Sequence, residues 1–457
     1  MDKNKQAKNK DRTDTTEKKV RRRHEKLFGS LPYKIWFAAV AILAVSVAAY
    51  WLYAGQAADF ALLCGAGVLI VCSPAPLYFS SLIMLALLKH TTVRRGAHFN
   101  SLKAVRKLMT VDTLAVNKNG IITMGKPHIA DIVTEGMTKK TLLKLAASAE
   151  KDATHPIGKA IVRAADEQNL VLSRLAAFHE IAGSGVEAIV NNAPVRVGSL
   201  AWLKKERVKV SATLATKNDQ LATRGKIPVF VSSGKYARGI IALQDDIISD
   251  SVAAVHRLQG LGLSVIMLTT ESSRTANAVQ KVTLLDGAIG SLSAMDKIRE
   301  LQLLRTKSAG VAMLGDTFNE PALFVAADLS IHLLPFIPPG TTYLSKRRVE
   351  TADMEAKAKA ALAELGPPVD PNTVNADLVL TKGLNALVAA VSFALNARKI
   401  EQQNFRPLLI ATMVLFVPAS GFLSPIGGWV FTLWQDCITA LVMFALLTVA
   451  NTIRLGT

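Results

Sequence analysis

The sequence predicts a membrane protein with about four helical spans and a large α/β region between the second and third of them. Half of its 457 residues are hydrophobic and the mean hydropathy is +0.29, as is typical of a chain partly embedded in lipid. The long uncharged runs lie near the two ends, whereas the middle alternates short apolar strands with amphipathic helices. Such alternation is typical of a parallel sheet covered by helices.

Two hairpins account for the predicted spans. Residues 35–54 and 60–88 carry no charge, and each run is long enough to cross a hydrocarbon core of about 30 Å. Residues 407–435 are also uncharged, but prolines and glycines from Pro418 onward divide the run. We therefore expect one span before this turn and another from residue 429 to about residue 450.

The N-terminal tail is strongly basic and includes the run Lys18-Lys19-Val20-Arg21-Arg22-Arg23. Because basic flanks stay cytoplasmic, we expect a multi-pass plasma-membrane protein whose soluble domains and both termini are cytoplasmic. The first apolar run begins too late and is too long for a cleavable signal peptide. We interpret the net charge of +19 as a topology signal and an attraction to membrane lipid, and we expect no nucleic-acid partner.

The α/β region is predicted to hold two domains, because one segment carries helices and turns of its own between two pieces of the other. The expected strands are residues 113–116, 228–231, 237–243, 264–268 and 310–314, and the expected helices include residues 251–261 and 274–282. The predicted division is a basic tail (1–34), a transmembrane hairpin (35–88), a first α/β domain (89–126 and 228–333), a domain inserted into it (127–227), a proline-flanked segment (334–375), a return to the first domain and a stalk (376–406), and a second hairpin (407–457).

One loop carries the strongest functional signal. An apolar strand runs into the tight turn Asn117-Lys118-Asn119-Gly120, which is followed by Ile121-Ile122-Thr123. This segment resembles the phosphorylation loop of P-type ATPases, Asp-Lys-Thr-Gly-Thr-Leu-Thr, in which the aspartate attacks the γ-phosphate of ATP. Asn117 stands at the position of that aspartate, and a carboxamide is no nucleophile at neutral pH. The resemblance therefore implies a P-type ATPase that has lost its phosphorylation step.

Three further motifs follow in the family's order. Thr269 stands where the family has Thr-Gly-Asp, although Glu271 replaces the aspartate. Lys297 matches the family lysine that faces the phosphate, where a cation offsets charge on a transferring phosphoryl group. Asp316 matches the carboxylate that binds Mg²⁺, but Glu320 replaces a second aspartate. The resemblance implies a haloacid-dehalogenase-like phosphorylation domain with a weakened Mg²⁺ site and with the catalytic positions held by Asn117, Lys118, Thr269 and Lys297.

The inserted segment resembles the nucleotide-binding domain of heavy-metal pumps of the copper and zinc type. Thr154-His155-Pro156 resembles their Ser-Glu-His-Pro-Leu motif, with Thr154 in place of the glutamate. Gly183-Ser184-Gly185 resembles the Gly-x-Gly segment that approaches the adenine. His155 has an alternative interpretation as a histidine at a helix start fixed by Pro156. The resemblance implies that His155, Gly183 and Gly185 contribute to a weak ATP site.

Several family features are missing. Heavy-metal pumps carry Cys-Pro-Cys or a close variant in the second of these spans, whereas this chain has Cys72-Ser73-Pro74-Ala75. Soft metals require thiolates, so we expect no copper or zinc site. The chain also contains no Thr-Gly-Glu actuator motif, and we expect the actuator domain and the leading helices to be absent from it. Residues 343–365 are expected to form an exposed charged helix, either a partner site or a solvated loop.

These features leave two hypotheses. The preferred one is a pseudoenzyme that binds ATP without forming the aspartyl phosphate and acts as a regulatory or partner subunit in the membrane. The alternative is an enzyme, one half of a split cation pump completed by another chain. The expected partners are membrane lipid and a membrane protein, with ATP and weakly held Mg²⁺ as cofactors.

Overall fold

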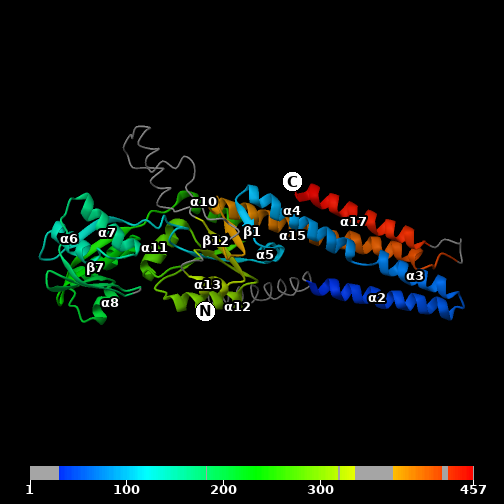
Figure 1. The fold of residues 1–457 in the computed structure, drawn as a ribbon, viewed down its shortest axis with the longest axis horizontal. Coiled ribbons are helices and arrows are strands. Elements are labelled where there is room, and N and C mark those ends of the chain that lie inside the picture. Colours follow the sequence, from blue (N-terminus) through cyan, green and yellow to red (C-terminus); the bar gives the residue numbers. More distant parts are fainter. Residues whose placement is uncertain (1–29, 182, 317–319, 335–373, 425–430, 456–457) are drawn as a thin grey trace, which may run out of the picture. The chain divides into compact units, whose positions relative to one another are not determined.

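The computed structural model describes residues 30–181, 183–316, 320–334, 374–424 and 431–455 (Figure 1). The chain divides into two compact units. The helical unit comprises residues 1–111, 308–310 and 389–457, and the α/β unit comprises residues 112–307 and 311–388. The predicted segment 334–375 lies almost wholly outside the described residues, as does most of the basic tail.

The helical unit is a bundle of long apolar helices. Helices α2 and α3 form a hairpin, and α17 packs against α3 and α4. Its elements are α2 (Ser30–Tyr53), α3 (Ala58–Val71), α4 (Ala75–Arg94), β1 (Ala97–Phe99), α5 (Leu102–Leu108), the C-terminal part of α15 (Leu384–Ala419) and α17 (Leu433–Leu455).

A proline interrupts the second apolar run. Helix α3 ends before Cys72, and α4 begins at Ala75 with Pro74 at its N-cap. The carbonyl oxygen of Cys72 accepts a hydrogen bond from Trp36 Nε1 at 3.1 Å, and Ser73 Oγ accepts one from the Ala75 N–H at 3.2 Å. Backbone groups inside lipid need internal partners, so α2 stabilises the break in its neighbour.

A buried polar contact joins three helices of this unit. Asn451 on α17 donates to Ser80 Oγ on α4 at 2.7 Å, and its own Oδ1 accepts from Asn404 Nδ2 on α15 at 2.5 Å. All three side chains are buried. Side-chain hydrogen bonds of this kind contribute to association between membrane helices, at about 0.6 kcal/mol each.

Three helical stretches of the described chain are long and apolar enough to span a membrane, rather than the four predicted. They are Lys34–Tyr53, Ala58–Arg94 and Leu433–Leu455. The expected third span falls on α15, where charged residues such as Glu401 and Arg406 precede a short apolar stretch that ends at Ala419. The rest of that uncharged run includes residues 425–430, which lie outside the described part.

The first sheet of the α/β unit is parallel, as predicted. Within this unit its strands follow the order β13-β12-β11-β2-β9-β10. The strands are β2 (Thr113–Asn117), β9 (Ser264–Leu268), β10 (Gly287–Ile289), β11 (Val311–Gly315), β12 (Leu329–Leu333) and β13 (Leu378–Leu380). The helices that follow them are α10 (Ser249–Gly260), α11 (Ser273–Thr283), α12 (Ala294–Lys307) and α13 (Pro321–Val325). Apolar side chains of β2, β9 and β11 pack with those of α12 and α13 in one core.

The inserted domain is built on a second, antiparallel sheet of order β3-β8-β7-β6-β5-β4. Helices α6 and α7 contribute to the core on one face, and α8 and α9 to the core on the other (Figure 1). The elements are β3 (His128–Thr134), α6 (Lys139–Ala149), α7 (Pro156–Glu167), β4 (Leu175–Ile181), β5 (Gly185–Val190), β6 (Ala193–Gly198), α8 (Leu200–Lys205), α9 (Ala212–Thr223), β7 (Ile227–Ser233) and β8 (Tyr236–Gln244).

The predicted boundary between the two domains is wrong at its C-terminal side. The segments 228–231 and 237–243 are strands, but they lie in β7 and β8, which pair with β6 and β3. The inserted domain therefore extends to Gln244 instead of ending at residue 227. An apolar run indicates a buried strand without naming its partner, and these two strands are joined by the tight turn at Gly234 (φ +61°) into a local hairpin.

Candidate functional site

The predicted catalytic positions meet at one edge of the parallel sheet. Asn117 ends β2, Thr269 follows β9 directly, and Asp316 follows β11. The register pairs Asn117 with Leu268 and Val116 with Leu314, so all three strands end at the same level. Strand β2 has β11 on one side and β9 on the other, so the chain reverses its direction of winding at the boundary between β2 and β11. Open α/β sheets bind their ligands at such a point.

A carboxylate of the chain lies between two of these groups. Asn117 Nδ2 donates to Glu320 Oε2 at 3.0 Å, and Lys297 Nζ donates to Glu320 Oε1 at 2.7 Å. Lys297 is 6% exposed, which leaves its ammonium little contact with water. Glu320 thus accepts from Lys297, the cation that the family resemblance places opposite the phosphoryl group, and from the amide that stands at the position of the family's nucleophile.

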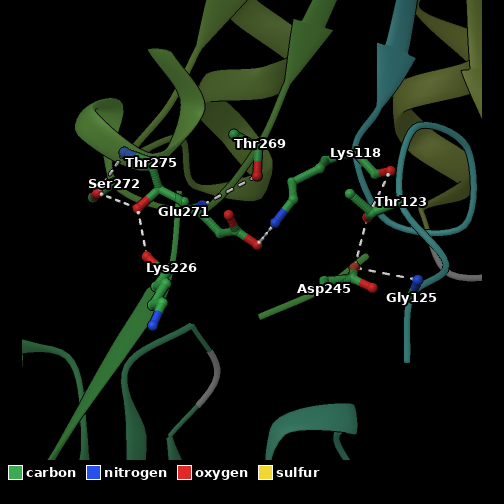
Figure 2. Close-up of polar contacts among 9 residues, drawn as sticks. All are labelled: Lys118, Thr123, Gly125, Lys226, Asp245, Thr269, Glu271, Ser272 and Thr275. Atoms are coloured by element: carbon green, nitrogen blue, oxygen red, sulfur yellow. Dashed lines mark hydrogen bonds and ion pairs between the residues drawn. The ribbon is translucent and has the colours of Figure 1, made fainter. Parts of the chain in front are cut away.

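The second lysine of the site is paired in the same way. Lys118 Nζ donates to Glu271 Oε1, and the two side chains are 2% and 11% exposed. Figure 2 shows Lys118 reaching across from the turn after β2 to the loop after β9, where the Glu271 N–H also donates to Thr269 Oγ1 at 3.2 Å. Sequence reasoning noted Glu271 only as a departure from the family. A buried lysine requires a counter-charge, but the sequence indicates neither that Lys118 is buried nor that Glu271 supplies the charge.

Asp245 is a further polar residue of this region that sequence reasoning missed. Its Oδ2 accepts from the Thr123 hydroxyl at 2.6 Å and from the Gly125 N–H at 3.2 Å (Figure 2). Thr123 also forms an isolated bridge with Ile247. These contacts join the segment that enters the inserted domain to the segment that leaves it.

The residues present fit Mg²⁺ poorly. Asp316 is a half-exposed carboxylate whose Oδ1 lies 4.0 Å from His332 Nδ1. Burial lowers the pKa of His332, and the charge of Asp316 opposes that shift only in part. Asn117 Oδ1 is buried and lacks a hydrogen-bond partner within the described residues, but it carries no charge. Because Glu320 is held by two donors, a divalent cation would meet one charged oxygen ligand among the residues described at this edge, where hard cations prefer several.

His155 has a structural role at the start of α7. Its Nδ1 accepts the Gly158 N–H at 2.9 Å and caps the helix, so its proton lies on Nε2. Nε2 lies 3.1 Å from Oε2 of Glu150, which is 2% exposed. Burial raises the pKa of Glu150, and the contact with His155 opposes this rise only in part. The geometry agrees with the alternative interpretation of His155, and its contribution to ATP binding stays a prediction.

The two glycines of the predicted adenine segment differ in their surroundings. A Cβ on Gly185 (φ +150°) would lie 2.2 Å from the carbonyl oxygen of Val197, so the close approach of β5 and β6 accounts for this glycine. Gly183 has φ +72°, and a Cβ there would meet no atom within 4 Å. Gly183 therefore leaves space in which a ligand could approach the backbone, and the two glycines differ in what they can contribute to binding.

In the helical unit, the predicted metal-ligand positions lie at the break between α3 and α4. Cys72 Sγ donates to the carbonyl oxygen of Thr412 at 3.7 Å, and Ser73 Oγ is engaged by Ala75. Asp436, in the first turn of α17, is completely buried, and neither of its carboxylate oxygens has a hydrogen-bond partner among the described residues. That a soft metal does not bind here stays a prediction.

Comparison with known proteins defines the class. The family model of haloacid dehalogenase-like hydrolases matches residues 111–327. The chain is 26% identical over 399 residues to "Probable copper-transporting ATPase PacS" of Synechococcus elongatus, covering 86% of this chain and 49% of that protein. It is 33% identical over 222 residues to "Probable copper-exporting P-type ATPase V" of Mycobacterium tuberculosis, covering 48% and 29%. A zinc-transporting PIB-type ATPase in the E2.Pi state superimposes with a TM-score of 0.59 at 26% identity, covering 92% of this chain and 62% of that one.

The fold and the site define a membrane protein with a haloacid-dehalogenase-like domain of the P-type ATPase kind. The chain is similar to heavy-metal P-type ATPases both in sequence and in structure. It spans about half, or less, of the length of the curated relatives that it matches.

Proposed function

We propose that this protein is a catalytically silent relative of heavy-metal P-type ATPases that binds nucleotide without forming an aspartyl phosphate and acts as a regulatory or partner subunit. One observation carries the proposal: Glu320 is bonded to both Asn117 and Lys297 at the edge of the sheet. The amide at position 117 supplies no nucleophile, and the cation that would face the phosphoryl group is already neutralised.

The ion pair between Lys118 and Glu271 supports the same proposal. Lys118 is the second cation at this edge of the sheet, and the Glu271 carboxylate neutralises it. An entering phosphoryl group carries negative charge and would have to displace Glu320 or Glu271 from a buried lysine. Displacement would leave a carboxylate desolvated beside an anion, which is strongly unfavourable at low dielectric.

The test is phosphorylation of the purified full chain with γ-labelled ATP. We expect no acid-stable, hydroxylamine-sensitive band in the wild type. Asn117→Asp alone should also give none, because Glu320 still occupies Lys297. Asn119→Asp, in the same turn, is the matched control for an added carboxylate. A hydroxylamine-sensitive band in the wild type would sink the proposal.

Nucleotide binding is assigned to the inserted domain, with His155, Gly183 and Gly185 as the candidate residues. We expect weak, saturable ATP binding with little dependence on Mg²⁺, because the metal site has lost charged ligands. Calorimetric titration of the full chain with ATP, with and without Mg²⁺, measures both properties. Gly183→Ala should weaken binding, whereas the equally open Gly234→Ala, in the turn between β7 and β8, should not. Absence of saturable heat at millimolar ATP would contradict this part of the proposal.

A second candidate function is one half of a split cation pump. The relatives are named as copper transporters, and this chain covers half or less of each of them. Co-purification from native membranes separates the two candidates. A partner that supplies a phosphorylatable aspartate or an actuator segment would favour the pump, and a complete, independent transporter as partner would favour regulation.

A further inference from the structure

A cavity of about 460 Å³ opens on the helical unit beside the break between α3 and α4. Its walls are mostly apolar and come from α2 and from the first turns of α4. The residues that matter here are Lys34, Phe37, Ala38, Pro74, Tyr78 and Phe79. Phe37 and Phe79 are each about half exposed, at 52% and 54%, so the cavity is open to the surroundings of the bundle.

The helix break accounts for the cavity. Pro74 cannot continue α3, and α4 begins only at Ala75, so the chain leaves the line of one continuous helix. Trp36 Nε1 holds the carbonyl oxygen of Cys72 at this point and keeps α2 close to the break. The small side chains of Ala38 and Ala75 do not fill the space between the two elements.

The position of the cavity along the span indicates what surrounds it. The candidate span Lys34–Tyr53 has 20 residues, and at about 1.5 Å per residue it matches the hydrocarbon core, about 30 Å thick. Lys34 therefore lies at one edge of the hydrocarbon. Aromatic side chains collect at this edge in membrane proteins, and Phe37, Tyr78 and Phe79 lie here. The cavity thus lies where the acyl chains of a phospholipid begin, next to a cation at headgroup level.

We propose that this cavity binds one acyl chain of an anionic phospholipid whose headgroup phosphate pairs with Lys34. An apolar cavity at this depth excludes water and is filled by hydrocarbon, because lipid is the solvent there. The charge is complementary, since Lys34 is at its edge and the chain N-terminal to it carries the basic run 18–23. A lysine near a membrane surface attracts an anionic lipid at an energy that corresponds to about a fivefold preference over a neutral one.

The test uses the full chain in nanodiscs of mixed phosphatidylcholine and phosphatidylglycerol with identical acyl chains, followed by native mass spectrometry of the lipids that stay bound. The wild type should retain one lipid and prefer phosphatidylglycerol about fivefold. Lys34→Gln should abolish the preference and keep the bound lipid, and Lys34→Arg should restore the preference. Ala38→Phe should fill the cavity and release the lipid. Ile42→Phe on the same helix, at a side chain 69% exposed, is the matched control and should behave as the wild type does.

Four results would overturn the proposal. Equal retention of both lipids by the wild type would remove the headgroup contact. Unchanged retention by Ala38→Phe would place the lipid elsewhere on the bundle. A polypeptide that co-purifies from native membranes in place of lipid, and that Ala38→Phe releases, would assign the cavity to a partner helix. Glycerol phosphate added in millimolar excess should displace no lipid, because the acyl chain supplies most of the binding; displacement would reduce the site to a phosphate site.

Discussion

Replacement of Glu271 by alanine tests whether the buried lysine of the site depends on its internal carboxylate. The side chains of Lys118 and Glu271 are 2% and 11% exposed, so the variant leaves a buried ammonium without a counter-charge. Loss of one partner from a buried pair costs about 3–5 kcal/mol, whereas an exposed pair contributes about 0–1 kcal/mol. Glu271→Gln keeps an acceptor for the ammonium and should cost about 1–3 kcal/mol.

Hydrogen exchange of the full chain measures this effect locally. Lys118 and Glu271 follow β2 and β9, so peptides of these strands should lose protection against exchange. The loss should correspond to about 3–5 kcal/mol in Glu271→Ala and about 1–3 kcal/mol in Glu271→Gln, up to the limit set by global unfolding. Peptides of β5 in the inserted sheet are the internal control and should not change. The double variant Lys118→Met, Glu271→Leu should recover most of the loss, since apolar groups of similar volume replace both charges. A loss below about 1 kcal/mol in Glu271→Ala would refute the reasoning, because that is the value for an exposed pair.

Three further predictions concern other parts of the chain. Burial raises the pKa of Glu150 above its ordinary 4.5, so the protonated carboxyl stabilises the inserted domain below pH 4.5, and this stability should be lost as the pH rises through the pKa of the folded state. Hydrogen exchange of α6 between pH 4.5 and 8 measures the loss, and Glu150→Gln should make it smaller. Gly185→Ala should destabilise the inserted domain strongly, since its Cβ would lie 2.2 Å from a carbonyl oxygen, whereas Gly183→Ala should cost about 1 kcal/mol by exchange of β5, as expected for a left-handed position in open space. Asp436→Asn should raise the thermal transition of the detergent-purified protein, because neither buried carboxylate oxygen has a partner in the described chain; a lower transition would indicate that the carboxylate has a ligand.

The sequence predicted three strands of the parallel sheet, β2, β9 and β11, and the edge at which its functional residues lie. The apolar runs that became β2, β9 and β11 have turn residues directly after them, and this pattern places Asn117, Thr269 and Asp316 at strand ends. The hydrophobic pattern of a segment predicts that it is a strand but not which strand it pairs with, so it could not assign β7 and β8 to the antiparallel sheet.

The ion pairs inside the site also could not be predicted from the sequence. Glu271 and Glu320 stood out only as departures from the family pattern, because nothing in the chain order indicates that they reach Lys118 and Lys297. The count of spans within the described residues, three instead of about four, differs for a related reason. An uncharged run shows that a segment tolerates lipid, but charges earlier in α15 shorten the apolar part of that helix.

The contact between Thr123 and Asp245 has a consequence for the order in which the chain folds. Strands β2 and β9 are neighbours in the parallel sheet, yet the whole inserted domain separates them in sequence. An unfolded chain must close that long loop before the strands pair, and the entropic cost grows with its length. Once the inserted domain is formed, Thr123 and Ile247 lie side by side, and only the turn after β2 and the segment that holds α10 remain between the two strands. Nucleation in the antiparallel sheet therefore turns a slow, non-local pairing into a nearly local one, so the domain that comes second along the chain should fold first.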